Sequence, residues 1–245
     1  MTAPWYELAF DRLYPVLYGH RDQAEAGRVV ENYRNLFAGD APVLDLACGN
    51  GRYLEAFGEA GLDMRGVDLS GFLLREAATS RGLAGRVVRG DMRSLPFRTG
   101  VAGGAISMFT SFGYFDADAD NEQVLQEVGR VLASGGVFLF DFANAGWILG
   151  NPPGDTVVER AGYQIDERRS LEDNGRFVVK RVVATPLDGT DPVRYEERVR
   201  LYRPAELEAM LSGAGLRIKE RYGDYDRAAF DPVGSQRFIT VCEKS

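Results

Sequence analysis

The stretch that decides the fold is Val43-Leu44-Asp45-Leu46-Ala47-Cys48-Gly49-Asn50-Gly51-Arg52-Tyr53-Leu54. It begins with a short apolar run, passes through a turn of small residues, and enters the start of an amphipathic helix. Gly49 and Gly51 allow the backbone to turn tightly and to bring its N–H groups close to a ligand. The order of strand, glycine turn and helix predicts a ligand-binding unit of an α/β fold.

Two further acids follow at the ends of later apolar runs, Asp68 after Arg65-Gly66-Val67 and Asp91 after Val87-Val88-Arg89-Gly90. Because the carboxyl ends of parallel strands meet at one edge of a sheet, both acids are expected to lie beside the glycine turn. A carboxylate can accept hydrogen bonds from two ribose hydroxyls or from an adenine amino group. The set therefore predicts a nucleoside pocket, whereas the alternative for each acid is a helix cap or a solvated turn.

The chain between residues 43 and 142 repeats this alternation of strand and helix. Strands are expected at 43–46, 64–67, 86–88, 105–109 and 137–142, and helices at 52–60, 70–80 and 120–132. Ser70 is expected to cap the second of these helices. A helix at 205–211 and strands at 216–222 and 238–243 close the chain. The pattern predicts an α/β fold with a doubly wound, mostly parallel sheet covered by helices on both faces.

Two segments fall outside this alternation. Residues 4–18 and 22–38 have helical spacing, with Pro15 expected to break or kink the first helix. Residues 157–202 alternate between polar and apolar, and the turn at 173–175 predicts a hairpin within an insertion of about three antiparallel strands. We therefore expect an N-terminal helical lid at 1–40, a ligand-binding domain at 41–150 and 203–245, and an antiparallel β insertion at 151–202. The insertion could cover the acceptor pocket or pair with another subunit in a homodimer.

Composition narrows the class of protein. The chain has 245 residues, a formal net charge of −7 and no long basic run, which argues against tight binding of a nucleic-acid backbone. Its two cysteines are far apart and read as reduced thiols of a cytoplasmic protein. With His20 as the single histidine, a His-based zinc site is not expected. The N-terminus lacks the pattern of a signal peptide, and no run is long enough to span a bilayer.

Taken together, the motifs resemble those of the class I S-adenosylmethionine-dependent methyltransferases over most of residues 43–142 and in the C-terminal helix and strands. Asp45, Ala47, Gly49 and Gly51 match the family's first motif, with Ala47 in place of the usual first glycine. The resemblance implies a Rossmann-like sheet of seven strands. It also implies S-adenosyl-L-methionine as the cofactor.

The resemblance implies cofactor-binding roles for individual residues. Asp68 matches the family's ribose-binding acid, and Asp91 matches its adenine-side acid, with Met92 beside the ring. Leu69 and Phe109 are expected to flank the adenine, with plain core packing as the alternative. The full set implied to bind the cofactor is Asp45, Ala47, Gly49, Asn50, Gly51, Asp68, Leu69, Asp91, Met92 and Phe109.

A dinucleotide is the competing cofactor, which would make the chain an NAD-dependent oxidoreductase. That fingerprint needs a third glycine three residues after the second, and this chain has Leu54 there. A third alternative is a non-catalytic module that senses S-adenosylmethionine. The predicted function is methyl transfer to an O, N or C atom of a small-molecule acceptor.

The acceptor side is predicted from aromatic and titratable residues near the lid. His20 is a candidate base because an acceptor that carries a proton must lose it, and its alternative role is that of a turn or helix-start residue before Asp22. Tyr114 follows the fourth strand, where open α/β sheets place their ligands, and is the second catalytic candidate. Tyr14 and Tyr18 are candidate substrate-binding residues, with packing under the lid as their alternative.

Overall fold

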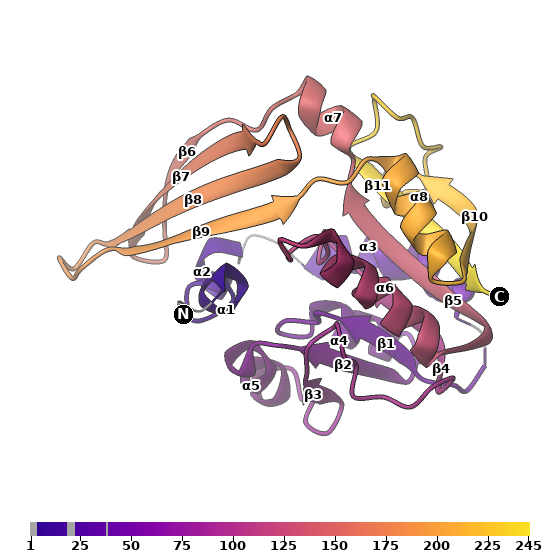
Figure 1. The fold of residues 1–245 in the computed structure, drawn as a ribbon. Coiled ribbons are helices and arrows are strands. Elements are labelled where there is room, and N and C mark those ends of the chain that lie inside the picture. Colours follow the sequence, from indigo (N-terminus) through magenta and orange to yellow (C-terminus); the bar gives the residue numbers. More distant parts are fainter. Residues whose placement is uncertain (1–3, 19–22, 38) are drawn as a thin grey trace.

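The computed structural model describes residues 4–18, 23–37 and 39–245, and its core is a seven-stranded sheet (Figure 1). The strand order is β10-β11-β5-β4-β1-β2-β3. The strands are β1 (Val43–Leu46), β2 (Met64–Asp68), β3 (Val87–Arg89), β4 (Ala102–Ser107), β5 (Leu132–Ala143), β10 (Leu216–Tyr222) and β11 (Arg237–Lys244). Strands β1 to β5 run parallel, whereas β11 is antiparallel to both β5 and β10. This confirms the predicted sheet, and the strand order reverses between β1 and β4, where such sheets bind ligands.

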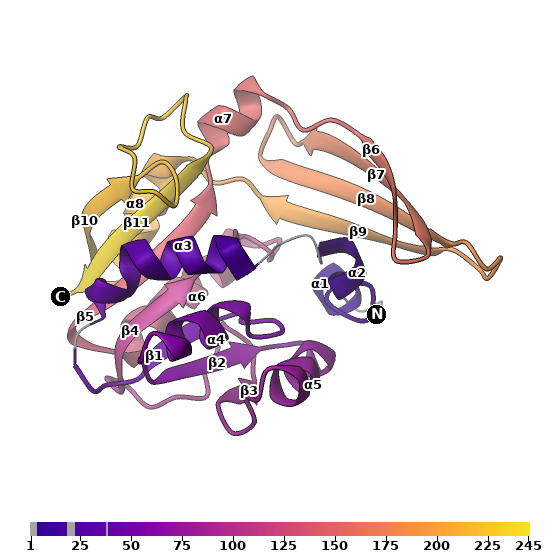
Figure 2. The ribbon, with the colours of Figure 1, turned by 180° about the vertical axis from the view of Figure 1, so that it is seen from behind.

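Helices cover both faces of this sheet. One face carries α6 (Asp118–Val131) and α8 (Pro204–Gly213), and the other carries α3 (Gln23–Tyr33), α4 (Arg52–Glu59) and α5 (Gly71–Ser80) (Figures 1 and 2). In β5, Phe138 and Phe140 pack into the core under α6 and α8, while Leu139 between them packs into the core on the opposite face. Strands buried on both faces read as continuous apolar runs, which is why the sequence predicts them well.

Several boundaries in this domain differ from those predicted. β4 ends at Ser107 rather than at residue 109, because Phe109 and Thr110 adopt φ angles of 59° and 61°, outside the range of a strand. α6 begins at Asp118 instead of Asp120. β5 begins at residue 132, since the small residues at 134–136 continue the chain as a strand instead of ending a helix. β4 begins at residue 102 rather than 105, and α8 spans 204–213 rather than 205–211. Shifts of one residue affect β2, β3, β11 and α4.

The N-terminal segment forms two short helices, α1 (Trp5–Ala9) and α2 (Tyr14–Tyr18), where one kinked helix was predicted. The break lies before Pro15, which sits in the first turn of α2, where a missing backbone N–H removes no helical hydrogen bond. The predicted helix at 22–38 is α3 followed by a short 3-10 helix, Arg34–Leu36. No helix in the described part of the chain combines the length and apolar character needed to cross a bilayer.

A second, antiparallel sheet projects from the main domain above α1 and α2 (Figure 1). Its order is β6-β7-β8-β9, with β6 (Thr156–Arg160), β7 (Tyr163–Glu172), β8 (Phe177–Pro186) and β9 (Val193–Arg200). The prediction of about three strands missed β6, because Val157 and Val158 are both exposed and give no alternation. A short helix, α7 (Ala145–Gly150), leads into this sheet and is capped by Asn144, whose Oδ1 accepts the Gly146 N–H at 3.0 Å.

Candidate active site

The glycine turn after β1 is held in a conformation that favours glycine. Ala47, Gly49 and Gly51 have φ angles of 54°, 55° and 81°. Packing disfavours a side chain at Gly51 as well, because its Cβ would clash with the buried side chain of Leu83 unless that side chain moved. Ala47 takes up this conformation without being glycine, at a cost of ~1–2 kcal/mol. Burial raises the pKa of the Cys48 thiol in the same turn, which favours a structural role for this small residue over that of a nucleophile.

Asp68 joins the end of β2 to this turn. Its Oδ2 atom accepts the Gly49 N–H at 2.8 Å, and its Oδ1 atom accepts the Ser70 N–H at 2.7 Å. Burial raises the pKa of Asp68, while these backbone N–H donors lower it. Ser70 caps α5 as predicted, since its Oγ accepts the Leu73 N–H at 3.1 Å. Asp68 therefore organises the turn in addition to lining the cavity described below.

Asp91 lies in the loop after β3 and is bound by Arg93. The Nη2 atom of Arg93 donates to Asp91 Oδ2 at 2.7 Å, and its backbone N–H donates to Oδ1 at 2.8 Å. Burial raises the pKa of Asp91, but the hydrogen bonds and charge of Arg93 outweigh it and lower that pKa. Arg93 also packs over the Phe115 ring, 4.3 Å from its centroid. Asp91 is therefore an ionised carboxylate. Its contacts with Arg93 were not predicted from the sequence.

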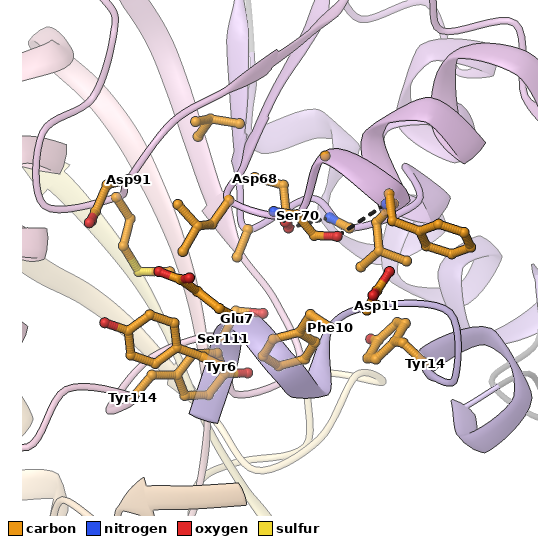
Figure 3. A pocket seen from close by; sticks show the side chains of 18 of the residues that line it. Tyr6, Glu7, Phe10, Asp11, Tyr14, Asp68, Ser70, Asp91, Ser111 and Tyr114 are labelled. Atoms are coloured by element: carbon orange, nitrogen blue, oxygen red, sulfur yellow. Dashed lines mark hydrogen bonds between the residues drawn. The ribbon is translucent and has the colours of Figure 1, made fainter. Parts of the chain in front are cut away.

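These residues surround one cavity of about 480 Å³, a size typical of small-molecule sites. Figure 3 shows Asp68 and Ser70 on one side, facing the aromatic rings of the N-terminal segment on the other. Seven predicted cofactor residues line this cavity: Ala47, Gly49, Asp68, Leu69, Asp91, Met92 and Phe109. A smaller adjoining cavity of about 60 Å³ is lined by Asp45 and Asn50, and shares Ala47, Gly49 and Phe109 with the larger one. Gly51 lines neither cavity, so its contribution is to the shape of the turn.

The smaller cavity contains a buried acid, Asp45, with one oxygen that has no hydrogen-bond partner among the described residues. Asp45 is 2% exposed, and its Oδ2 atom accepts no hydrogen bond within the described part of the chain. Burial raises the pKa of Asp45 well above its usual range, the negative charge of Asp68 raises it further, and Arg52 lowers it. Arg52 lines the same cavity and pairs with Glu25 at 2.9 Å. Arg52 was not predicted as a site residue, although this arginine directly follows the glycine turn.

Aromatic side chains form the opposite wall of the large cavity, which we call the aromatic roof (Figure 3). Its members come from α1, α2 and the segments that follow α1 and β4: Trp5, Tyr6, Phe10, Tyr14, Tyr18, Tyr114 and Phe115. Tyr114 contacts the N-terminal segment directly, since its ring lies 5.0 Å from that of Trp5 and stacks at 5.6 Å on that of Phe10. Trp5, Tyr6 and Phe10 were not predicted to lie in the site. The high density of aromatic residues between positions 5 and 18 could have indicated them.

The roof is attached to the second sheet through Tyr18. The Tyr18 hydroxyl donates to the Glu197 carboxylate at 2.8 Å, and Lys180 lies 2.8 Å from the same carboxylate and 4.5 Å from the Tyr18 ring centroid. Glu197 also lines the cavity. The structure places Tyr14, Tyr18 and Tyr114 around one cavity, whereas His20 lies outside the described residues.

The comparisons with known proteins agree with this geometry. Residues 43–136 match a family model described as a methyltransferase domain. The dTDP-3-amino-3,4,6-trideoxy-alpha-D-glucopyranose N,N-dimethyltransferase of Streptomyces venezuelae is 29% identical over 250 residues, which cover 96% of this chain and 99% of that protein. The dTDP-4-amino-2,3,4,6-tetradeoxy-D-glucose N,N-dimethyltransferase of Saccharopolyspora spinosa is 29% identical over 231 residues, or 89% of each chain.

Solved structures share the fold. An S-adenosylmethionine-dependent methyltransferase from Clostridium acetobutylicum has a TM-score of 0.79 at 21% identity and covers 95% of this chain and 96% of its own. The CcbJ methyltransferase from Streptomyces caelestis has a TM-score of 0.78 at 22% identity and covers 100% of both chains. These findings do not support the dinucleotide alternative. With its glycine turn, its acids at successive strand ends and the matched domain, the chain is a class I S-adenosylmethionine-dependent methyltransferase.

Proposed function

We propose that this enzyme N-methylates an amino group of a small molecule, and that the substrate is a nucleotide-linked deoxyamino sugar. The observation that carries the proposal is the aromatic and acidic wall opposite the cofactor motifs. The names of three relatives support the substrate class, because each is an N,N-dimethyltransferase of a dTDP-linked amino sugar.

We propose that the cofactor binds across both cavities, and we call the residues that would contact it the cofactor seat. Asp68 would accept hydrogen bonds from the ribose, and Asp91 would accept one from the adenine amino group while it stays paired with Arg93. The unpaired Oδ2 of Asp45 fits an ammonium group, and the guanidinium of Arg52 fits a carboxylate, so the smaller cavity suits the amino-acid end of S-adenosylmethionine. When bound, this cofactor supplies a methyl group on a positively charged sulfur.

The aromatic roof and its acids would bind the acceptor. An aliphatic amine is mostly protonated at neutral pH, and aromatic faces and carboxylates both attract such a cation. Glu7 and Asp11 line the cavity from the lid and are exposed, so they would bind the ammonium form and pass its proton to solvent. The buried indole Nε1 of Trp5 donates to no group in the part of the chain that the structure describes, so it would offer a donor to a substrate oxygen.

The roof would also hold the amine in line with the cofactor and exclude water, two effects that account for much of the acceleration in a group transfer. Tyr114, the predicted catalytic residue of the roof, would contact the acceptor through its ring or its hydroxyl. The role of His20 as a base stays a prediction.

The division into parts is likewise proposed: a lid at 1–40, a cofactor-binding domain at 41–150 and 203–245, and an insertion at 151–202 that supports the lid. The contacts of Tyr18 with Glu197, and of the Leu17 carbonyl with Arg160 at 2.5 Å, support this role for the insertion. A homodimer formed through the insertion stays a prediction.

The experiment that tests the proposal has two steps. Thermal unfolding should show stabilisation by S-adenosylhomocysteine and none by NAD. The enzyme with S-adenosylmethionine should then add one or two methyl groups, detected by mass spectrometry, to a dTDP-linked amino sugar and none to the matched sugar with a hydroxyl in place of the amine. Methylation of the hydroxyl sugar, or of neither compound with a cofactor-binding enzyme, would contradict the proposed substrate.

A further inference from the structure

The turn that follows β4 has an unusual backbone. Phe109 and Thr110 are consecutive residues with φ angles of 59° and 61°, in the left-handed region that residues other than glycine rarely adopt. Such a conformation persists only where the surrounding structure holds it in place. Both residues line the large cavity, and Phe109 lines the small cavity as well. The turn thus lies where the two cavities meet.

Asp141 of β5 holds this turn with its side chain and its backbone. Its Oδ2 atom accepts the Phe109 N–H at 2.7 Å, and its backbone carbonyl accepts the Thr110 N–H at 3.1 Å. Asp141 is 0% exposed. Two successive N–H groups of the turn are therefore bound by one buried residue of the neighbouring strand.

Two residues from the C-terminal part of the chain complete this network. Arg237 of β11 donates from Nε to Asp141 Oδ1 at 2.7 Å and from Nη2 to Thr110 Oγ1 at 3.0 Å. The Tyr225 hydroxyl donates to Asp141 Oδ2 at 2.8 Å. We call Asp141, Arg237 and Tyr225 the clamp. The carboxylate receives donors at both oxygens, which is the condition for keeping a buried charge.

None of the three clamp residues lines either cavity, and all three lie beyond residue 136, where the matched methyltransferase domain ends. A buried ion pair is weak evidence for stability, since an apolar cluster of the same shape often stabilises as well. Its distinctive effect is to fix a single arrangement of polar groups, and here that arrangement is the Phe109–Thr110 turn.

We infer that the clamp is a positioning device for the cofactor: it holds the Phe109–Thr110 turn in its left-handed conformation, and the affinity for cofactor depends on it. The C-terminal hairpin thereby acts on the cavities through the turn, without lining them itself. The inference rests on the cofactor seat proposed above.

The test uses Tyr225→Phe, with Tyr202→Phe as its matched control. Tyr202 is buried, whereas Tyr225 is partly buried, and like Tyr225 it donates its hydroxyl to an aspartate, Asp118, at 2.7 Å, but it lines neither cavity. Calorimetry with S-adenosylhomocysteine, well below the unfolding temperature of both variants, should show affinity lowered about fivefold in Tyr225→Phe, the factor that corresponds to ~1 kcal/mol. Affinity should be unchanged in Tyr202→Phe, even where both variants unfold at a lower temperature.

A rescue variant separates positioning from stability. Asn tolerates the left-handed conformation better than Thr and keeps a side-chain oxygen, so Thr110→Asn in the Tyr225→Phe background should recover part of the lost affinity. Equal affinity in the parent and Tyr225→Phe, an equal loss in Tyr202→Phe, or no recovery in the double variant would overturn the inference. A parent protein that does not bind S-adenosylhomocysteine would instead refute the proposed seat.

Discussion

Replacing Asp45 by Asn should stabilise the free protein and weaken its binding of cofactor. Asp45 is 2% exposed, and its Oδ2 atom accepts no hydrogen bond in the part of the chain that the structure describes. Asn has nearly the same shape and no charge. The substitution therefore removes a buried carboxylate that folding disfavours, and with it the acceptor that we assign to the ammonium group of the cofactor.

The change in stability and the change in cofactor affinity can both be estimated from the contacts of Asp45. An unpaired buried polar group costs ~1–3 kcal/mol, and because the amide of Asn keeps polar atoms at the site, we expect a gain of ~1 kcal/mol in the free energy of unfolding. For a chain of this size that raises the Tm by about 2–4 °C. Loss of a charge-assisted hydrogen bond costs ~1.5–3 kcal/mol, so the affinity for S-adenosylhomocysteine should fall by about 10- to 150-fold.

The difference in stability between Asp45→Asn and the parent should change with pH in a definite direction. Burial raises the pKa of Asp45 above its value in the unfolded chain, so the native state holds the proton more tightly. Its contribution to stability is then full below the unfolded pKa of ~3.9 and is lost as the pH rises through the higher native pKa. The stability advantage of Asp45→Asn should therefore grow as the pH rises from about 4 towards neutrality.

Thermal unfolding at several pH values and calorimetry with S-adenosylhomocysteine measure the two effects. Asp63→Asn is a suitable control, because Asp63 has 43% of its side chain exposed and pairs only with Arg65 in the described structure. A variant at Asp45 that unfolds at a lower temperature and binds S-adenosylhomocysteine like the parent would refute the assignment.

Three further substitutions test the rest of the site. Asp68→Ala should weaken S-adenosylhomocysteine binding by ~1.5–3 kcal/mol in calorimetry, and should also lower the Tm because two backbone N–H groups lose their acceptor; unchanged affinity would remove Asp68 from the site. Arg52→Gln should raise the Kd for S-adenosylhomocysteine more than that for adenosine, while an equal effect on both would contradict its contact with the amino-acid end. Tyr18→Phe, which loses its hydrogen bonds to Glu197, should raise the KM for the acceptor and leave the KM for S-adenosylmethionine unchanged.

The cofactor side could be predicted from the sequence because its signals are local. Gly51 must be glycine both for its φ of 81° and for its contact with Leu83, and the acid at Asp68 ends a strand that is buried on both faces. Each feature appears in a few consecutive residues, and the parallel sheet brings strand ends together without further information. The dual role of Asp68 could not be predicted, since it depends on the distance to Gly49 across the turn.

The acceptor side was harder to predict because its residues meet only in the folded chain. Glu197 is separated from Tyr18 by 179 positions, and no pattern around either residue indicates that they form a hydrogen bond. The same holds for the contact between Asp141 and Arg237, which are 96 positions apart. Apolar periodicity predicts which faces are buried, but it carries no information on which polar groups pair inside.

The position of the insertion explains how one fold can keep its cofactor site and change its acceptor. The second sheet enters the chain after β5, and its last strand, β9, packs against α1 while Glu197 binds Tyr18. The N-terminal helices and the second sheet therefore form one wall of the cavity, whereas the glycine turn and strand ends form the other. Under the proposed assignment, substitutions in the first wall would alter the acceptor pocket without moving Asp68, so acceptor specificity could vary on this scaffold while the proposed cofactor seat stays fixed.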